Sequence, residues 1–98
     1  MKDLDRVIHE PVRLRILCLL AGAKTADFKF LLTTLRVSTG NLSSHMDKLE
    51  KAKFVKADKS FNGKFPQTTY RMTASGRKAL QQHWDKLDEI RGTSSGDD

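Results

Sequence analysis

The strongest constraint on the fold is a pair of apolar stripes with helical spacing that lie close together in the sequence. The first stripe has the i, i+3, i+4, i+7 spacing of one helix face and consists of Phe28, Leu31, Leu32 and Leu35. The second stripe consists of Leu42, Met46 and Leu49. Ser38, a favourable N-cap residue, precedes the second stripe, and Arg36 and Val37 leave only a short connection. The sequence therefore predicts two short helices joined by a tight turn.

Further helical patterns lie on both sides of this pair. Pro11 suits the first turn of a helix that should end with Gly22 as its left-handed cap. The apolar stripe of this helix consists of Leu14, Leu17 and Leu20, with Ile16 beside them. Thr25 is expected to cap the second helix. Thr73 is expected to cap a last helix that ends near Arg91.

Between the third and last helices, the pattern indicates a β-hairpin. Residues 54–61 form a mixed strand with apolar ends, and residues 68–73 alternate with the period of two that is typical of a half-buried strand. Asn62 and Gly63 both tolerate positive φ and mark the turn. Pro66 lacks a backbone donor, so it must lie at an edge or in the loop. The sequence thus predicts a mainly α fold with a small β-hairpin.

With 98 residues, the chain is expected to form one domain over residues 1–91, followed by a disordered Gly/Ser/Asp-rich tail over residues 92–98. Its apolar runs are too short to span a membrane. Its first residues include two acidic groups and lack the apolar segment of a secretory signal. We therefore expect an intracellular, cytoplasmic protein with no membrane partner.

Positive charge is concentrated in the middle of the chain. The whole chain has a formal net charge of +6, whereas residues 24–78 alone hold 12 basic and 4 acidic residues. Residues 79–98 are net acidic. A basic stretch of this kind favours a polyanionic partner, although a solvated basic face without any ligand would have the same composition.

The expected order of elements is helix, helix, short turn, helix, hairpin, helix. The second and third helices would form a helix-turn-helix, a motif whose second helix enters the major groove of DNA. The third helix suits that role because small polar residues lie near its start. Gly40 would let the backbone approach the bases, and Asn41 can make a bidentate contact to adenine. Ser43 and Ser44 can donate or accept hydrogen bonds, and Lys48 can reach a phosphate or a guanine.

Four segments resemble winged helix-turn-helix transcriptional regulators of the MarR/ArsR type. Residues 9–20 resemble the signature of the family's first helix, and residues 37–52, the most specific segment, resemble its recognition helix. Residues 59–70 have the length and charge of a wing, and residues 70–77 resemble the motif that closes the wing and opens the last helix. The resemblance implies a homodimer that binds a roughly palindromic site on double-stranded DNA.

The resemblance also implies which residues contact DNA. The recognition helix, residues 38–52, would lie in the major groove, and the wing, residues 59–68, along the backbone or minor groove. The expected DNA-binding residues are Ser38, Thr39, Gly40, Asn41, Ser43, Ser44, His45, Lys48, Lys59, Asn62 and Lys64. The two wing lysines are expected mainly on phosphates. Asn62 is first of all a turn residue, and His45 would either bond to DNA or pack at the edge of the core.

Two positions depart from the family pattern. Lys53 stands where the family usually has glycine, so either Lys53 adopts a left-handed backbone or the helix ends differently. Asp47 falls on the DNA-facing side of the recognition helix, where it could accept from a cytosine amine but would repel phosphates.

The last helix is expected to form a dimer interface. The other three helices already supply apolar faces for a core, and a long terminal helix with a tryptophan suits contact with a second copy. The expected interface residues are Leu4, Val7, Ile8, Leu80, Trp84, Leu87 and Ile90.

We expect no metal site, cofactor or enzymatic centre. His9, His45 and His83 lack the spacing of a local ligand pair, and Cys18 lies in an apolar run, which predicts a buried, inert thiol. The sequence suggests no Ser-His-acid triad, phosphate-binding glycine loop or paired carboxylates.

The prediction is a sequence-specific DNA-binding transcriptional regulator, most simply a repressor. The alternatives are a winged-helix protein-interaction module that binds no DNA and a repressor that responds to a metal or a small molecule.

Overall fold

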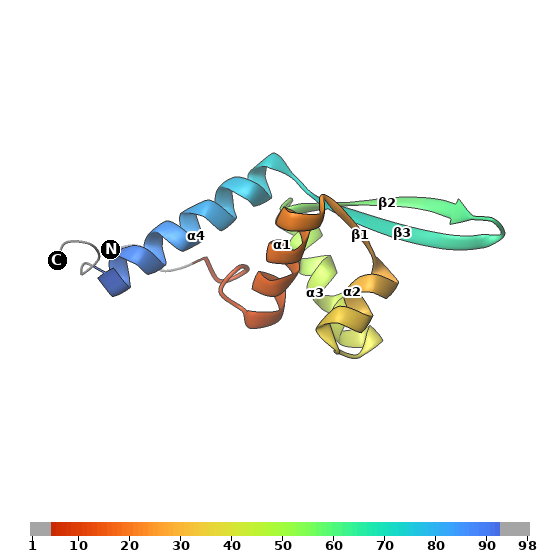
Figure 1. Ribbon diagram of the computed structural model, residues 1–98, viewed down its shortest axis with the longest axis horizontal. Coiled ribbons are helices and arrows are strands. Elements are labelled where there is room, and N and C mark those ends of the chain that lie inside the picture. Colours follow the sequence, from red (N-terminus) through yellow and green to blue (C-terminus); the bar gives the residue numbers. More distant parts are fainter. Residues whose placement is uncertain (1–4, 93–98) are drawn as a thin grey trace.

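Three helices form the body of the protein, and a β-hairpin and a long terminal helix extend from it in opposite directions (Figure 1). The computed structural model describes residues 5–92. Its elements in chain order are α1 (Pro11–Ala23), β1 (Thr25–Asp27), α2 (Phe28–Leu35), α3 (Thr39–Lys51), β2 (Val55–Asn62), β3 (Phe65–Met72) and α4 (Ala74–Gly92). The principal extents are 57 × 25 × 23 Å. The tail expected beyond Gly92 and the expected interface residue Leu4 lie outside the described residues.

The core forms where the apolar stripes of α1, α2 and α3 meet. Its largest fully buried side chains are those of Ile8, Ile16, Leu17, Leu20, Leu31, Leu42, Met46 and Leu49. The stripe predicted for α3 is confirmed in full, and in α2 Leu31 and Leu35 are buried while Phe28 and Leu32 pack against the core. Complete burial of one such side chain stabilises the fold by roughly 1.5–3 kcal/mol, so these contacts set the orientation of each helix.

Two helices begin at the residues that the sequence predicts. Ser38 Oγ accepts a hydrogen bond from the backbone N–H of Asn41 at 3.0 Å at the start of α3. Thr73 Oγ1 accepts one from the backbone N–H of Gly76 at 3.0 Å at the start of α4. Each side chain satisfies one of the backbone donors that a helix start leaves unpaired.

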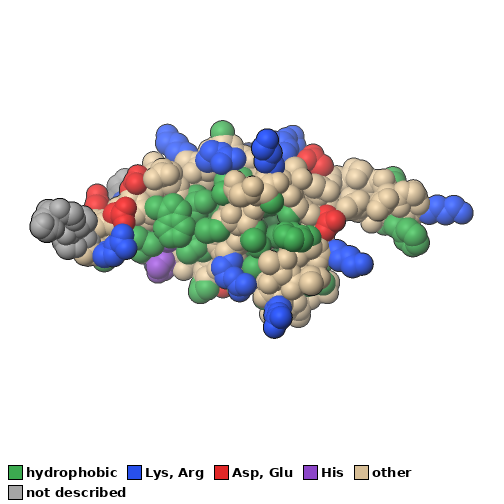
Figure 2. Space-filling model, viewed as in Figure 1, with side chains coloured by type: hydrophobic (Ala, Val, Ile, Leu, Met, Phe, Trp, Pro, Cys, Tyr) green, Lys and Arg blue, Asp and Glu red, His purple; other side chains and the backbone are tan. Residues whose placement is uncertain are grey.

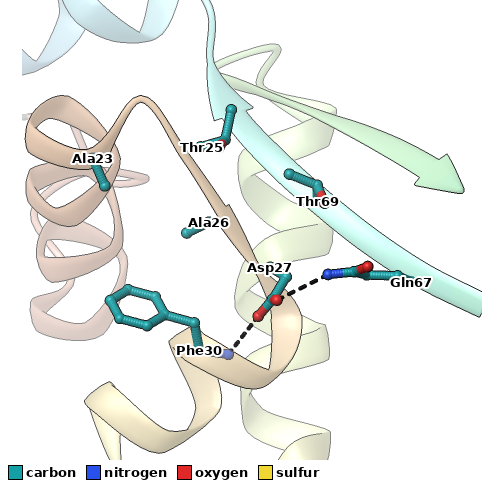
Figure 3. A pocket seen from close by; sticks show the side chains of 7 residues that line it. All are labelled: Ala23, Thr25, Ala26, Asp27, Phe30, Gln67 and Thr69. Atoms are coloured by element: carbon teal, nitrogen blue, oxygen red, sulfur yellow. Dashed lines mark hydrogen bonds between the residues drawn. The ribbon is translucent and has the colours of Figure 1, made fainter. Parts of the chain in front are cut away.

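The prediction that Thr25 caps α2 is wrong. This segment forms β1 instead, which pairs antiparallel with β3 and places Ala26 opposite Tyr70. Asp27 caps α2, because its Oδ1 accepts from the backbone N–H of Phe30 at 2.7 Å (Figure 3). Pairing with a strand more than 40 positions away in the sequence therefore delays the start of the helix.

The predicted glycine cap of α1 is also wrong. The helix continues through Gly22 to Ala23, and it is Lys24 that has a positive φ, 68°. The backbone N–H of Lys24 donates to the carbonyl of Leu20 at 3.2 Å. The chain turns at Lys24 because the next residue already belongs to β1.

The strands form a three-stranded antiparallel sheet in the order β1-β3-β2. The pairing of Asn62 with Phe65 closes the hairpin, so the two loop residues are Gly63 and Lys64, and Gly63 has a φ of 68°. The hairpin is confirmed, but its loop begins one residue later than the sequence suggests. Pro66 lies in β3 at a point that β1 does not reach, so this stretch has an open edge, as expected.

Helix α3 ends at a left-handed residue that is not glycine. The backbone N–H of Phe54 donates to the carbonyl of Leu49 at 3.0 Å, and that of Lys53 donates to Glu50 at 2.9 Å. These are the two bonds of a Schellman motif. Lys53 has a φ of 67°, which confirms the first of the two alternatives for this position. A left-handed backbone at a residue with a Cβ costs roughly 1–2 kcal/mol, which the paired hydrogen bonds help to offset.

Of the glycines at positions 22, 40, 63 and 76, only Gly76 has no room for a side chain. A Cβ built there would lie 2.2 Å from the carbonyl oxygen of Phe54 and 2.9 Å from Met72 Cγ. The first turn of α4 therefore packs directly on the backbone between α3 and β2.

We expect Gly76→Ala to lower the free energy of unfolding by about 1–3 kcal/mol, because backbone atoms must move to admit the methyl group. The matched control is Gly22→Ala, where a Cβ meets nothing within 4 Å. That substitution within a helix should raise the stability by roughly 0.5–1 kcal/mol. Urea denaturation of both variants measures the difference, and equal effects would contradict the close contact.

Candidate nucleic-acid interface

The polar side of α3 is open to solvent, while its apolar side is buried in the core. Most of the DNA-binding residues expected on this helix are exposed: Ser38, Thr39, Gly40, Asn41, Ser43, Ser44 and Lys48. Ser38 caps α3 at its N-terminus. The backbone N–H groups of the first turn point out of this end of the helix and favour an anion. The structure thus presents one exposed face with small polar groups at its start and a lysine further along.

Nothing inside the protein requires a glycine at position 40. A Cβ built on Gly40 meets no atom within 4 Å, and the backbone there is helical. A glycine within a helix is unfavourable relative to alanine by roughly 0.5–1 kcal/mol. The packing of this chain therefore does not require a glycine at position 40.

His45 does not share the exposure of the other residues on this helix. Its side chain is only 18% exposed, and its Nδ1 lies 3.0 Å from Arg13 Nη1. Of the two alternatives for His45, the structure supports packing at the edge of the core. A guanidinium only donates, so Nδ1 is the acceptor in this contact.

Arg13, which our sequence reasoning missed, joins α1 to two other parts of the chain. Besides contacting His45 of α3, its Nε donates to the carbonyl of Val7 at 2.6 Å and its Nη2 to that of Arg6 at 3.4 Å. The side chain is buried. The available signal was its position three residues before Ile16, on the core side of α1.

The acidic residue on the exposed face of α3 is paired. Asp47 Oδ2 lies 3.1 Å from Lys51 Nζ, one helical turn away. Both side chains are exposed, so the pair adds little to stability. It does place a positive charge beside Asp47, which offsets the repulsion that this carboxylate would exert on a phosphate.

The wing presents its three expected DNA-binding residues to solvent. Lys59 and Asn62 lie in β2, Lys64 lies in the loop, and all three are exposed. On the face shown in Figure 2, Lys and Arg side chains surround the body, and one projects from the tip of the wing.

A polar contact ties the wing to the helix-turn-helix. Asp27 uses one carboxylate oxygen to cap α2, and its other oxygen accepts from Gln67 Nε2 of β3 at 2.9 Å (Figure 3). One side chain thus holds the start of α2 against the hairpin. Sequence reasoning missed Asp27 as the cap because it assigned the cap to Thr25, two residues earlier.

The described residues expected at a dimer interface divide into three groups. Ile8 and Leu80 are buried in the core of the protomer itself, so their placement at an interface is wrong. Ile8 is buried because the N-terminal segment folds back onto the core, and Leu80 is buried because it lies on the side of α4 that packs against the core. Trp84 and Ile90 remain 38% and 54% exposed. Val7 and Leu87 are partly buried.

Trp84 also borders an apolar hollow between α4 and the body of the protein. The hollow is lined by Leu14, Arg15, Cys18, Leu19, Thr34 and Trp84. Figure 2 shows hydrophobic side chains gathered where α4 meets the body. Apolar surface of this kind marks a place where another surface can pack.

The expectation of a buried thiol at Cys18 is wrong. Cys18 is exposed, because α1 turns Ile16, Leu17 and Leu20 toward the core and leaves Cys18 on its outer side. Partial burial nevertheless raises the pKa of the Cys18 thiol, which keeps it protonated and weakly nucleophilic.

Two kinds of site are absent from residues 5–92. Within this range, no group of three or more His, Cys, Asp or Glu side chains is arranged to hold a metal ion. Within the same range, no helix combines the length and apolar character needed to cross a membrane.

His83 of α4 is buried beside two other rings. Its ring centroid lies 5.6 Å from that of His9 and 5.4 Å from that of Trp84. Among the described residues, neither of its ring nitrogens has a hydrogen-bond partner. Burial lowers the pKa of His83, and nearby His9 lowers it further, while Asp5 opposes the shift.

The lowered pKa predicts that the protein loses stability in mild acid. The unfolded chain binds a proton at His83 near pH 6.5, whereas the folded chain resists it. The contribution of His83 is therefore complete above pH 6.5 and falls as the pH drops through the folded-state pKa. Urea denaturation between pH 7.5 and 5 should show this loss, and His83→Leu should reduce it. An unchanged pH dependence in that variant would contradict the assignment.

The structure defines the class of protein, because a helix-turn-helix with an exposed polar second helix and a hairpin wing is the architecture of a winged helix DNA-binding domain. The family model described as a winged helix DNA-binding domain matches residues 12–91. The chain belongs to this family, and its resemblance to winged helix-turn-helix transcriptional regulators is confirmed.

Three known proteins illustrate the relationship. An uncharacterized protein from Methanocaldococcus jannaschii is 33% identical over 78 residues, which are 80% of this chain and 85% of that protein. A transcriptional regulator homologue from Pyrococcus horikoshii OT3 has a TM-score of 0.82 at 28% identity, over 88% of this chain and 85% of that chain. NadR, solved in complex with 4-hydroxyphenylacetate, has a TM-score of 0.66 at 26% identity, over 92% of this chain and 68% of that chain. This chain is thus a DNA-binding regulator by family and by fold.

Proposed function

We propose that the protein is a homodimeric repressor that binds a specific double-stranded DNA sequence without catalysing a reaction. The observation that carries this proposal is the exposed polar face of α3, opposite three buried apolar side chains. A helix held in this way can enter a major groove, which is about 12 Å wide.

Within the groove, the side chains of α3 make different kinds of contact with the DNA. Asn41 can donate to and accept from an adenine edge, and the two serines can bond to bases or phosphates. Gly40 lets the backbone approach the DNA, since it has no role in the packing of the chain. Lys48, Lys59 and Lys64 contribute mainly through phosphates, so that affinity falls steeply with salt.

The second copy packs along α4. This helix is 19 residues long and extends away from the body (Figure 1). Trp84 and Ile90 are exposed on it, and Trp84 borders the apolar hollow. A twofold dimer would present two copies of α3 to half-sites spaced about 34 Å apart along the DNA. A dimer bound at such a site represses transcription by excluding other proteins from the same DNA. The protein acts in the cytoplasm.

Selection of bound sequences from random duplexes should yield a palindrome with half-sites about 10 base pairs apart.

On the selected site, Asn41→Ala should lose about 1–3 kcal/mol of binding free energy and relax the sequence preference at one base pair of each half-site. Lys64→Ala should weaken binding to all sequences about equally. Gly40→Ala should leave the fold intact and weaken DNA binding. If the protein shifts no duplex at low salt, the alternative of a protein-interaction module is correct.

The dimer is tested separately by sedimentation. The wild-type protein should sediment as a dimer at micromolar concentration, and Trp84→Ser combined with Ile90→Ser should shift it toward monomer, since both changes remove exposed apolar surface from α4. Phe30→Ser is the matched control, because Phe30 is 47% exposed and belongs to α2. A wild-type monomer would contradict the proposed interface.

A further inference from the structure

Two phenylalanines flank the loop of the wing and face solvent. Phe61 is 75% exposed and Phe65 is 76% exposed, more than any other large hydrophobic side chain among the described residues. The sheet does not need either ring for its packing. Two neighbouring aromatic rings left in water mark a surface that contacts another molecule.

The register of the hairpin places the two rings on opposite faces. Phe61 is paired with Pro66, and Asn62 is paired with Phe65. Paired residues share a face of the sheet and successive residues alternate between faces, so Phe61 lies with Pro66 on one face and Phe65 lies on the other. Figure 2 shows hydrophobic side chains on both sides of the wing tip. A flat partner could cover only one of these rings, whereas a cleft with two walls covers both.

The charge of the tip indicates the nature of those walls. Residues 59–66 include Lys59 and Lys64 and no acidic residue. The nearest acidic residue in the sequence, Asp58, is paired with Arg71 at a distance of 3.4 Å. The tip therefore combines apolar rings with unopposed positive charge. This combination suits a minor groove of DNA that is widened beyond its usual width of about 6 Å, with sugars as its walls and phosphates as its rims.

The position of the wing suits the same partner. α3 ends at Lys51 and β2 begins at Val55, so the wing starts where the recognition helix stops. Each strand of the hairpin has eight residues, which corresponds to a length of about 26 Å. A wing of this length can extend from a major groove occupied by α3 to the adjacent minor groove.

We propose that the wing tip is an apolar wedge: Phe61 and Phe65 enter the minor groove, pack against its sugar walls and partly unstack a base step, while Lys59 and Lys64 hold the flanking phosphates. Proteins that insert apolar side chains in this way kink the duplex. The inference rests on the proposed DNA-binding function and adds bending of the DNA and a preference for flexible base steps under the wings.

The test compares wild-type protein with Phe61→Ser/Phe65→Ser on the duplex obtained by selection. Dyes at the two ends of the duplex report bending by energy transfer, and 2-aminopurine placed at successive flanking positions reports unstacking. We expect the wild type to bend the duplex and raise 2-aminopurine fluorescence under each wing. The double variant should lose both signals and bind about tenfold more weakly. Phe61→Leu/Phe65→Leu, which keeps an apolar tip, should retain most of the bend.

The salt dependence separates the rings from the lysines. The double serine variant should lower affinity without changing the slope of log K against log salt concentration, because it removes no phosphate contact. Lys64→Ala should reduce the magnitude of that slope by about 0.9 for each phosphate released. Phe30→Ser should change neither the bend nor the slope. Since both rings are exposed, thermal unfolding of the double variant should match that of the wild type.

Three results would overturn the inference. If the double serine variant binds and bends the selected duplex as the wild type does, the wedge is wrong while the proposed DNA-binding function stands. If it binds DNA normally but loses dimerisation, the tip contacts a second copy instead. If the wild-type protein binds no duplex at all, both the proposed function and the wedge are wrong.

Discussion

The burial of Leu42, Met46 and Leu49 is the contact on which the rest of the structure depends. These three side chains occupy one side of α3, and a helix that buries one side must present the other. The same contact therefore anchors α3 in the three-helix core and exposes its small polar residues together. Ser38 adds to this by starting the helix at the point where those residues begin. The exposed polar side of α3 therefore needs no other contact to keep it at the surface.

One polar side chain connects this helix to α1, and a second connects α2 to the wing. Arg13 joins α1 to His45 of α3 and to the carbonyls of Val7 and Arg6, and Asp27 joins the start of α2 to Gln67 of the wing. Both residues are charged and make several hydrogen bonds from one group, which holds the parts in a defined orientation. The distance between α3 and the wing is thus set within one domain, and α4 leaves Trp84 and Ile90 exposed to solvent.

Local patterns account for the features that were predictable. Helical periodicity identified the buried faces of α2 and α3, capping chemistry identified Ser38 and Thr73, and the Asn62-Gly63 pair located the hairpin. The errors share one origin. Thr25 lies in β1 because β3 offers it a partner, Ile8 is buried because the N-terminal segment folds onto the core, and Cys18 is exposed because α1 turns another side inward. Each depends on residues far away in the sequence.

The amino-acid sequence by itself determined the number and order of the helices, the place of the wing, the concentration of positive charge and the polar character of α3. These follow from interactions between residues a few positions apart, which the chain carries in any conformation. Only the tertiary structure decided that His45 belongs to a packed contact, that Asp27 links α2 to the wing, and that Phe61 and Phe65 stand uncovered on opposite faces of its tip. Exposure and contact are properties of the packed chain, because they depend on which distant surfaces meet.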